Sequence, residues 1–241
     1  MKAALVDRNS QFQQTLWELQ RKLGQQVLTP LGSLAARDRI ATGFAEIDAL
    51  LGGGIRVGQV TALIGAPSAG ATSLGFSLMA QAQQGGRGVF AVDLGASFDP
   101  WTALQWGVQP ELLSAIRAPE VEHSLEVLRL LIREAPRALI VLDAADGQRS
   151  AALLRHLPKL LTKTGGELVK NHGALILLLP RLPGQAAQTS FNTILLLERQ
   201  RWLLRDEDIA GYHTRVTLLK DQALNEARSA LVEIWLKGEP Q

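Results

Sequence analysis

The stretch from Val60 to Ala82, VTALIGAPSAGATSLGFSLMAQA, has the spacing of a phosphate-binding loop. An apolar run leads into Gly65, four residues follow, and Gly70 and Thr72 then open a segment of helical character. A glycine-rich turn between a strand and a helix lets backbone N–H groups surround a phosphate, and the helix dipole favours its charge. A hydroxyl at Thr72 is placed to bind magnesium. The spacing therefore predicts a turn with the shape of a nucleotide phosphate site.

The same stretch carries Ala71 where such a loop needs a lysine. That lysine neutralises the β- and γ-phosphates and the charge that develops during phosphoryl transfer. Removing one donor of this kind costs about 3 kcal/mol of transition-state stabilisation. We therefore expect no resident cofactor, weak binding of ATP and magnesium at most, and no efficient turnover. The alternative is a tight turn between Gly65 and Gly70 whose helix packs only through apolar contacts.

A carboxylate follows a second apolar run, RALIVLD, at Asp143. At the end of a buried strand, such a carboxylate can meet a magnesium ion beside a phosphate. The alternative is an ordinary carboxylate at the exposed end of a strand. Four histidines, His123, His156, His172 and His213, show no spacing typical of metal ligands, so the sequence predicts no metal site of its own.

Basic side chains lie around an aromatic one in the stretch LERQRWLLRDEDIAGYHTR. The residues are Arg199, Arg201, Trp202 and Arg205. Arginines beside a tryptophan can bind a phosphate backbone or stack on a base, so this stretch is a candidate for contact with single-stranded DNA. The alternative is an exposed edge strand that is protected by charge. A second basic stretch contains Lys159, Lys163 and Lys170.

The elements that must position these residues follow from the hydrophobic pattern. Strand-like runs occupy residues 58–65, 88–94, 137–143 and 173–179. Helical patterns lie near residues 70–84, 121–134 and 150–163. Apolar strands separated by helices predict a mostly parallel sheet flanked by helices on both faces. After residue 190, three strand-like runs with short polar joins predict antiparallel hairpins at one edge. The fold class is therefore α/β.

A short amphipathic helix is expected near the amino terminus, in SQFQQTLWELQRKLG. Its apolar face consists of Phe12, Leu16, Leu19 and Leu23. Ser10 and Gln13 form a capping box, and Gly24 ends the helix. We divide the chain into residues 1–37, a helix and linker, and residues 38–241, the main domain. The helix either docks into a groove of a partner or packs on its own core.

Composition sets the class of protein. The chain has 241 residues with a formal net charge of +2, and 46% of them are hydrophobic, which is ordinary for a globular domain. It has no cysteine, which excludes disulfides and thiolate catalysis. Neither a signal peptide nor a membrane-spanning run is recognisable. We therefore expect a soluble, cytoplasmic protein with no membrane contact.

Several of these stretches together resemble the core of the RecA recombinase family. The segment IATGFAEIDALLGGGIRVGQVTALIGAPSAGATS is similar to the entry to that core, with Thr42-Gly43, Asp48 and a glycine cluster at Gly52 to Gly54 in the family's places. FAVDLGASFDP resembles the family's second strand, and its Asp99-Pro100 matches a dipeptide near the adenine. The resemblance makes Asp143 the magnesium-facing carboxylate of the Walker B strand.

The later part of the chain extends the resemblance to about residues 10–236. TRVTLLKDQ is similar to the strand that carries two lysines to the nucleotide of a neighbouring subunit, with Lys220 at the first position and Gln222 at the second. Lys163 and Lys170 fall near the family's first DNA-binding loop. The amino-terminal helix is similar to the one by which RecA docks on an adjacent protomer. The resemblance therefore implies a RecA-like P-loop core, with self-association as a further expectation.

The departures from the family pattern concern hydrolysis. The family's catalytic glutamate falls at Gly95, and its sensing glutamine at or beside Pro180. The second DNA-binding loop is shortened to PRLPGQAAQTS, and the family's carboxy-terminal domain is not recognisable. The general base, the phosphate lysine, one bridging lysine and the sensor are absent together, which argues that hydrolysis is not the role of this chain.

With its altered phosphate loop and its length, this RecA-like chain resembles ImuA, an accessory factor of mutagenic translesion synthesis in the bacterial DNA-damage (SOS) response. The resemblance implies a nucleoid-associated adaptor without enzymatic activity. Its partners would be RecA or a RecA-like protein, a Y-family polymerase-like protein, a replicative-type polymerase and single-stranded DNA. The alternative is a DNA-dependent or nucleotide-switched ATPase that uses Lys220, or an arginine, of a neighbouring subunit. A further alternative is a DNA-binding modulator that caps RecA filaments.

Overall fold

The computed structural model describes Glu18, Arg21 and residues 38–118, 120–205, 208–221 and 228–236. The chain divides into two compact units, Met1–Arg37 and Asp38–Gln241. The four apolar residues of the expected docking helix, Phe12, Leu16, Leu19 and Leu23, lie outside the described residues. Their docking role therefore stays a prediction.

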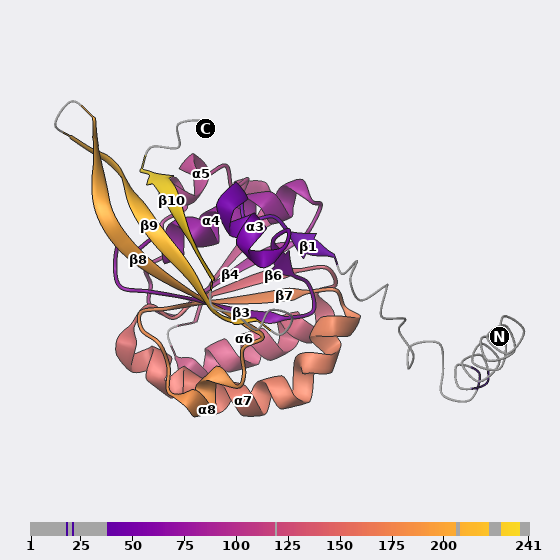
Figure 1. Cartoon of the computed structure of the whole chain (residues 1–241). Helices are drawn as coiled ribbons and strands as arrows, with labels where there is room; N and C mark the ends of the chain where they lie inside the picture. The colour runs from indigo at the N-terminus through magenta and orange to yellow at the C-terminus, as the bar shows by residue number, and fades with distance from the viewer. Residues whose placement is uncertain are drawn as a thin grey trace, which may run out of the picture. The chain divides into compact units, whose positions relative to one another are not determined.

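The larger unit is built on an eight-stranded sheet with the order β10-β9-β8-β3-β7-β6-β4-β5 (Figure 1). The strands from β8 to β5 in that order run parallel, whereas β9 and β10 run antiparallel to their neighbours. Their bounds are β3 Val60–Gly65, β4 Val89–Asp93, β5 Leu113–Arg117, β6 Leu139–Asp143, β7 Ala174–Leu179, β8 Thr193–Arg205, β9 Asp208–Asp221 and β10 Arg228–Trp235. A separate two-stranded sheet pairs β1 (Arg39–Ile40) with β2 (Ile55–Arg56). The predicted fold class is confirmed.

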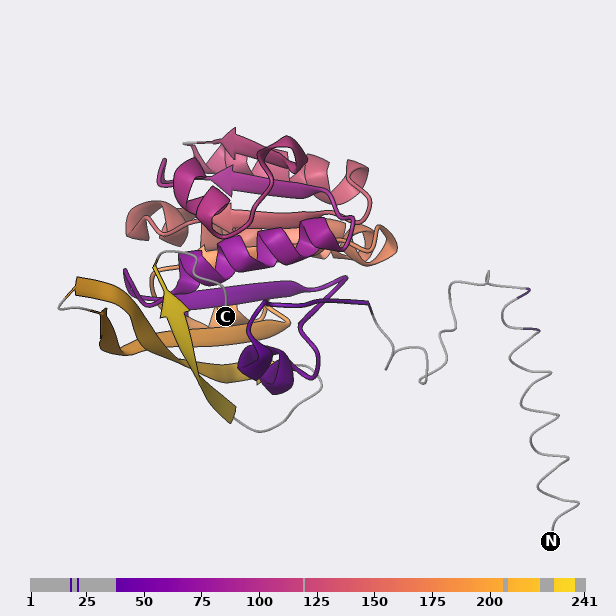
Figure 2. The same cartoon turned by 90° about the horizontal axis from the view of Figure 1, so that it is seen from above.

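Helices cover both faces of the sheet, as Figures 1 and 2 show. One face carries α3 (Ala45–Leu51), α4 (Ala71–Gln84) and α5 (Pro100–Gln105), and the other carries α6 (Val121–Glu134), α7 (Gly147–Lys170) and α8 (Gln185–Gln188). A one-turn 3-10 helix, Pro110–Leu112, precedes β5. Every residue of β3, β6 and β7 is buried. Continuous apolar runs at the centre of the chain's sheet therefore fill two cores, one under each helical layer.

Several short elements are absent from the sequence-based expectation. The edge strand β5, the short strand β2 and the short helices α5 and α8 have no counterpart among the expected elements, and α7 runs from residue 147 to 170 where 150–163 is predicted. Gly165 and Gly166 read as helix breakers, since each costs about 1 kcal/mol in a helix. The helix nevertheless continues through them because Leu168 is buried against the sheet one turn later.

The hairpin of β8 and β9 extends beyond the helical layers (Figure 1). The first half of β8 is buried between β3 and β9, and its second half is largely exposed. Register shifts interrupt the β8–β9 pairing at three places, the middle one between Arg199 and Arg201. Within the described ranges, no helix is both long and apolar enough to cross a membrane.

Candidate functional site

The phosphate-loop sequence folds as its spacing predicts, with β3 leading into a turn and α4 beginning at Ala71. Ser68 has a φ of 61° and Gly70 a φ of 103°, so both adopt the left-handed region. Gly70 is the N-cap of α4, and no side chain caps it. The first N–H groups of a helix have no partner within it, so those that follow Gly70 lie at the mouth of the turn.

The antiparallel strands β9 and β10 contact the carboxyl end of this loop, at Ala69 and Gly70. A β-carbon at Gly70 would lie 2.6 Å from Cδ1 of Ile234 on β10 and 3.4 Å from the ring of Tyr212 on β9. Thr214 on β9 donates a hydrogen bond from Oγ1 to the carbonyl of Ala69 at 3.0 Å. Only glycine fits the end of the loop, and the late strands of the sheet set its shape.

A pocket of about 290 Å³ opens beside the loop. It is lined by residues 65–68, 70–73 and 178–180 and by Ser97, Asp143, Ala145 and Tyr212. None of these described lining residues is a lysine, an arginine or a histidine. Ala71, at the position of the phosphate lysine, is partly buried and packs against the core. The pocket therefore offers backbone N–H groups, hydroxyls and one carboxylate, without a cation from its own lining.

Two carboxylates meet at the ends of neighbouring strands. Asp93 on β4 pairs in register with Asp143 on β6, and both side chains are buried. Asp93 accepts hydrogen bonds from the N–H groups of Ser97 and Phe98, each at 3.1 Å, and so fixes the loop that follows β4. Asp143 accepts from Oγ of Ser97 at 2.9 Å and from the N–H of Ala145 at 3.0 Å. Burial raises the pKa of Asp143, the two hydrogen bonds partly oppose this, and Asp93 adds to the rise.

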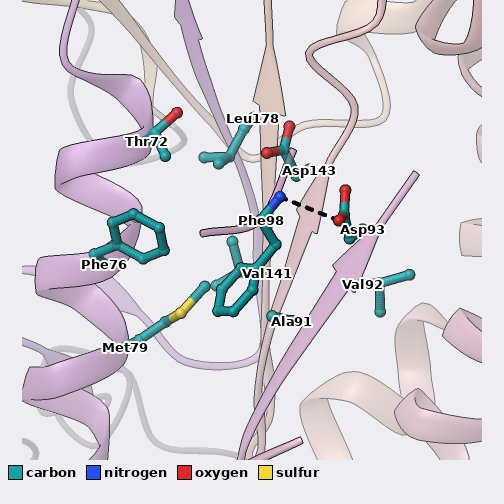
Figure 3. A pocket seen from close by; sticks show the side chains of 11 residues that line it. Thr72, Phe76, Met79, Ala91, Val92, Asp93, Phe98, Val141, Asp143 and Leu178 are labelled. Atoms are coloured by element: carbon teal, nitrogen blue, oxygen red, sulfur yellow. Dashed lines mark hydrogen bonds between the residues drawn. The ribbon is translucent and has the colours of Figure 1, made fainter. Parts of the chain in front are cut away.

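Apolar side chains fill the space between α4 and the sheet next to these carboxylates (Figure 3). Phe76 on α4 and Phe98 meet edge to face with their ring centroids 5.7 Å apart. Leu178 lines both this space and the phosphate-loop pocket, and in Figure 3 it is seen between Thr72 and Asp143. The space between α4 and the sheet is therefore packed core, and the polar pocket lies on the other side of Leu178, beside the loop.

The two positions that the family resemblance links to hydrolysis both lie near this opening. Gly95 follows β4, and a β-carbon there would lie 3.5 Å from Oγ of Ser97, an ordinary contact. A side chain is thus sterically allowed at Gly95, but none is present. Pro180 follows β7 and lines the pocket, and a proline has no N–H to donate. Neither residue supplies a proton acceptor or a donor from its side chain.

Asp99 and Lys220 lie away from the pocket lining. Asp99 is exposed and caps α5, accepting from the hydroxyl of Thr102 at 2.6 Å and from the N–H groups of Trp101 and Thr102. The Thr102 hydroxyl is the main cause of a lowered pKa at Asp99. Lys220 pairs with Ile194 near the start of β3, whereas the loop follows the other end of β3. Its Nζ donates to the carbonyl of Gln188 at 2.9 Å, so Lys220 cannot serve its own loop.

One arginine of the basic stretch stacks on the tryptophan. The guanidinium carbon of Arg199 lies 4.0 Å from the ring centroid of Trp202, a cation–π contact. Trp202 meets Tyr212 edge to face at 5.8 Å, and the hydroxyl of Tyr212 lies 3.1 Å from that of Ser73 in the first turn of α4. Burial raises the pKa of Tyr212, with smaller opposing effects from Ser73 and Arg199. Aromatic and hydroxyl contacts thus join the hairpin to the phosphate loop.

The other predicted DNA-binding residues are dispersed. Arg201 lies next to Trp202 on β8, so its side chain takes the opposite face, where its Nη2 is 3.2 Å from Nε2 of His213. Arg205 pairs with Asp208 near the hairpin tip. All three arginines are exposed, and their contact with DNA stays a prediction.

The resemblance places Lys163 and Lys170 near the family's first DNA-binding loop, and the structure places them on a helix. Both residues lie on α7, and both are exposed. The buried stripe of this helix, which includes Leu157 and Leu168, holds it on the sheet, so no loop is formed there. Any contact of these lysines with nucleic acid would come from a helix surface.

Sequence reasoning did not single out Asp93, Ser97 or Tyr212. Asp93 is the last residue of an apolar strand, the same signal that identified Asp143, and so could have been found. Ser97 and Tyr212 act through partners that are 46 and 139 residues away in the chain, and no local pattern signals such contacts.

A strand–loop–helix phosphate turn, a parallel sheet and paired strand-end carboxylates define a P-loop core, and the comparisons narrow it further. The chain belongs to the RecA family, because a family model described as RecA N-terminal domain matches residues 10–156. Protein RecA of Thermus aquaticus is 32% identical over 57% of this chain and 42% of its own length. Protein RecA of Deinococcus radiodurans is 27% identical over 66% of this chain and 50% of its own length.

Protein RecA of Chloroflexus aurantiacus is 25% identical and the match covers 91% of this chain and 72% of that protein. The chain thus spans about half the length of the first two relatives and more of the third. Similarity at this level establishes the family and leaves the activity of the chain to be argued from its own residues.

Proposed function

We propose that this chain is a RecA-like accessory protein that does not hydrolyse ATP and acts as an adaptor in mutagenic translesion synthesis. In this role it connects RecA or single-stranded DNA to a Y-family polymerase-like partner at the nucleoid, as the resemblance to ImuA implies. RecA-family membership supports an interaction with DNA or with RecA-type proteins. The identity of the polymerase partner is part of the proposal.

The observation that carries the proposal is the absence of a cation from the described lining of the phosphate-loop pocket. A magnesium triphosphate needs positive charge on its β- and γ-phosphates, both for binding and for the transition state. Ala71 supplies none, and the nearest acidic group, Asp143, adds negative charge. The backbone of the loop fits a phosphate, but the side chains do not fit catalysis, so we derive no step of phosphoryl transfer.

The fixed shape of the loop supports a structural role. Thr214, Tyr212 and Ile234 hold Gly70 and Ala69 in place through contacts from the hairpin strands. A loop that is anchored in this way can support the surface of the domain whether or not a nucleotide is bound. We therefore assign the function of the domain to surfaces that bind partner molecules.

The position of Lys220 favours one competing function. Because it lies at the far end of the sheet from its own loop, it can reach a nucleotide only on a neighbouring molecule. An ATPase assembled between subunits would release phosphate at a specific rate that rises with protein concentration, and Lys220→Ala would abolish that release. A specific rate indistinguishable from the no-enzyme blank at every concentration would exclude this function.

Co-sedimentation tests the adaptor role itself. The protein is added to filaments of a purified RecA on single-stranded DNA, formed with a non-hydrolysable ATP analogue, and the pelleted fraction is measured. We expect saturable co-sedimentation that Leu16→Glu combined with Leu19→Glu weakens at least tenfold, while Gln13→Glu combined with Gln20→Glu leaves it unchanged. Pelleting no greater than with DNA alone, for all variants, would count against an adaptor that engages RecA.

A further inference from the structure

A groove lies between α7 and the segment that follows β7. Its volume is about 530 Å³, and it shares no lining residue with the phosphate-loop pocket. The segment 181–187 forms one wall, and the first half of α7 forms the other. The groove is thus a second concave surface, of a size that accommodates a few side chains of a ligand.

The floor of the groove is aliphatic. Leu154 and Pro158 come from α7, and Leu182 and Pro183 come from the facing segment. Leu182 is 45% exposed, so its side chain is accessible from the groove. Pro158 lies inside the helix and has no N–H, so the carbonyl of Leu154 lacks its usual helical donor. The groove therefore presents an apolar surface, and the α7 wall is locally irregular at Pro158.

Two arginines flank this floor. Arg155 on α7 and Arg181 after β7 both line the groove and both are exposed. Within the described part of the chain, neither is joined to a carboxylate in an ion pair. Lys159 follows Arg155 by one helical turn and is also exposed. The rim is therefore positively charged, and a ligand with carboxylates complements it.

The chemistry of the groove favours a peptide over other occupants. Its wall 181–187 lies in the segment that resembles the family's second DNA-binding loop, but the lining contains no aromatic side chain on which a nucleobase could stack. The chain's own first 37 residues carry five basic and two acidic side chains, so their charge repels the rim. An acidic segment with apolar anchors matches both the rim and the floor.

We propose that this groove binds an acidic amphipathic peptide segment of a partner protein. One or two large aliphatic or aromatic side chains of the segment fill the hollow over Leu154 and Leu182, and its carboxylates bind Arg155 and Arg181. The inference rests on the proposed adaptor function, since it names the chemistry of one partner of that adaptor.

Selection from a displayed library of random dodecapeptides on the full-length protein tests the groove. We expect enriched peptides with Asp or Glu within three residues of Leu, Phe or Trp. Their affinity, measured by fluorescence anisotropy, should fall at least tenfold for Arg155→Glu and for Arg181→Glu. A peptide with lysine in place of its acidic residue should regain binding to Arg181→Glu. Arg117→Glu, at an exposed arginine of β5 outside the groove, is the matched control and should leave binding unchanged.

Three results would overturn the inference. The first is a selection that enriches no acidic sequences. The second is enriched peptides that bind Arg155→Glu and Arg181→Glu as tightly as the natural chain. The third is binding of a twenty-residue oligothymidylate that these two variants lose. Circular dichroism of each variant verifies that it is folded, and Leu182→Glu provides a second test at an exposed position. ATP turnover by the protein would contradict the proposed function and leave this peptide result unaffected, so the two failures are distinguishable.

Discussion

The hydroxyl of Tyr212 lies 3.1 Å from the hydroxyl of Ser73, which joins a late strand of the sheet to the first turn of the phosphate-loop helix. Tyr212 is buried, and its ring also contacts Trp202. We expect Tyr212→Phe to lower the free energy of unfolding by about 1 kcal/mol, since it removes one hydrogen bond and keeps the ring. Urea denaturation measures the loss. Ser73→Ala should cost a similar amount, and the double variant should cost less than the two together; fully additive costs would contradict the contact.

Gly70 should tolerate no side chain. Gly70→Ala places a β-carbon 2.6 Å from Cδ1 of Ile234 and forces alanine to a φ of 103°, so we expect a loss of about 3 kcal/mol in stability. Gly86 is the matched control because its φ is also positive, at 68°, but nothing lies within 4 Å of an added β-carbon. Gly86→Ala should cost about 1 kcal/mol. Equal losses at the two positions, measured by thermal unfolding, would show that the contact with Ile234 has no effect.

The buried carboxylate of Asp143 should make stability depend on pH. Burial raises the pKa of Asp143 in the folded state, so its stabilising effect is complete below the ordinary carboxyl pKa and is lost as the pH rises through the raised one. Asp143→Asn removes this loss. Relative to the natural chain, the variant should therefore gain stability between pH 4 and pH 7.

Asp99→Asn is the control of opposite sign. Hydrogen bonds, chiefly from Thr102, lower the pKa of Asp99, so this carboxylate stabilises the fold above the ordinary pKa and loses that effect as the pH falls through the lowered one. Asp99→Asn should therefore be less stable than the natural chain at neutral pH. Denaturation curves at a series of pH values measure both variants, and parallel pH profiles for the two would refute the assignment.

Much of the fold could be predicted because it depends on local patterns. The apolar runs that became β3, β6 and β7 are buried throughout, so their composition alone identifies central parallel strands. The edge strand β5, with the sequence LSAIR, is partly exposed on both faces and has no such signature. Edge elements gain less from burial, and their sequence is correspondingly less constrained.

The site was predictable where residues act through the backbone of their own loop. Gly65, Gly70 and Thr72 take the predicted places because their spacing is a property of one turn. The contacts of Thr214 with Ala69 and of Tyr212 with Ser73 depend on how β9 returns beside α4, which only the tertiary structure defines. Arg199 and Arg201 are two residues apart and would share a face of a regular strand, but the register shift between them separates them, which no local pattern signals.

A lysine at position 71 should restore affinity for a triphosphate. Ala71 is partly buried at the start of α4, beside the pocket, so Ala71→Lys adds one cation where the phosphates would lie. We expect the dissociation constant for magnesium ATP to fall at least tenfold, which corresponds to about 1.4 kcal/mol. Ala71→Met adds a side chain of similar length without charge and should leave the affinity unchanged. Equal affinities of the two variants would show that charge is not what the pocket lacks.

The most direct measurement of the central claim uses the natural chain. Magnesium ATP is titrated into the purified protein by calorimetry, and phosphate release is followed in the same samples with and without single-stranded DNA. The account predicts little or no heat and no phosphate above the no-enzyme blank in either condition, because no side chain in the described pocket lining neutralises the phosphates. Sustained phosphate release that DNA stimulates would contradict it.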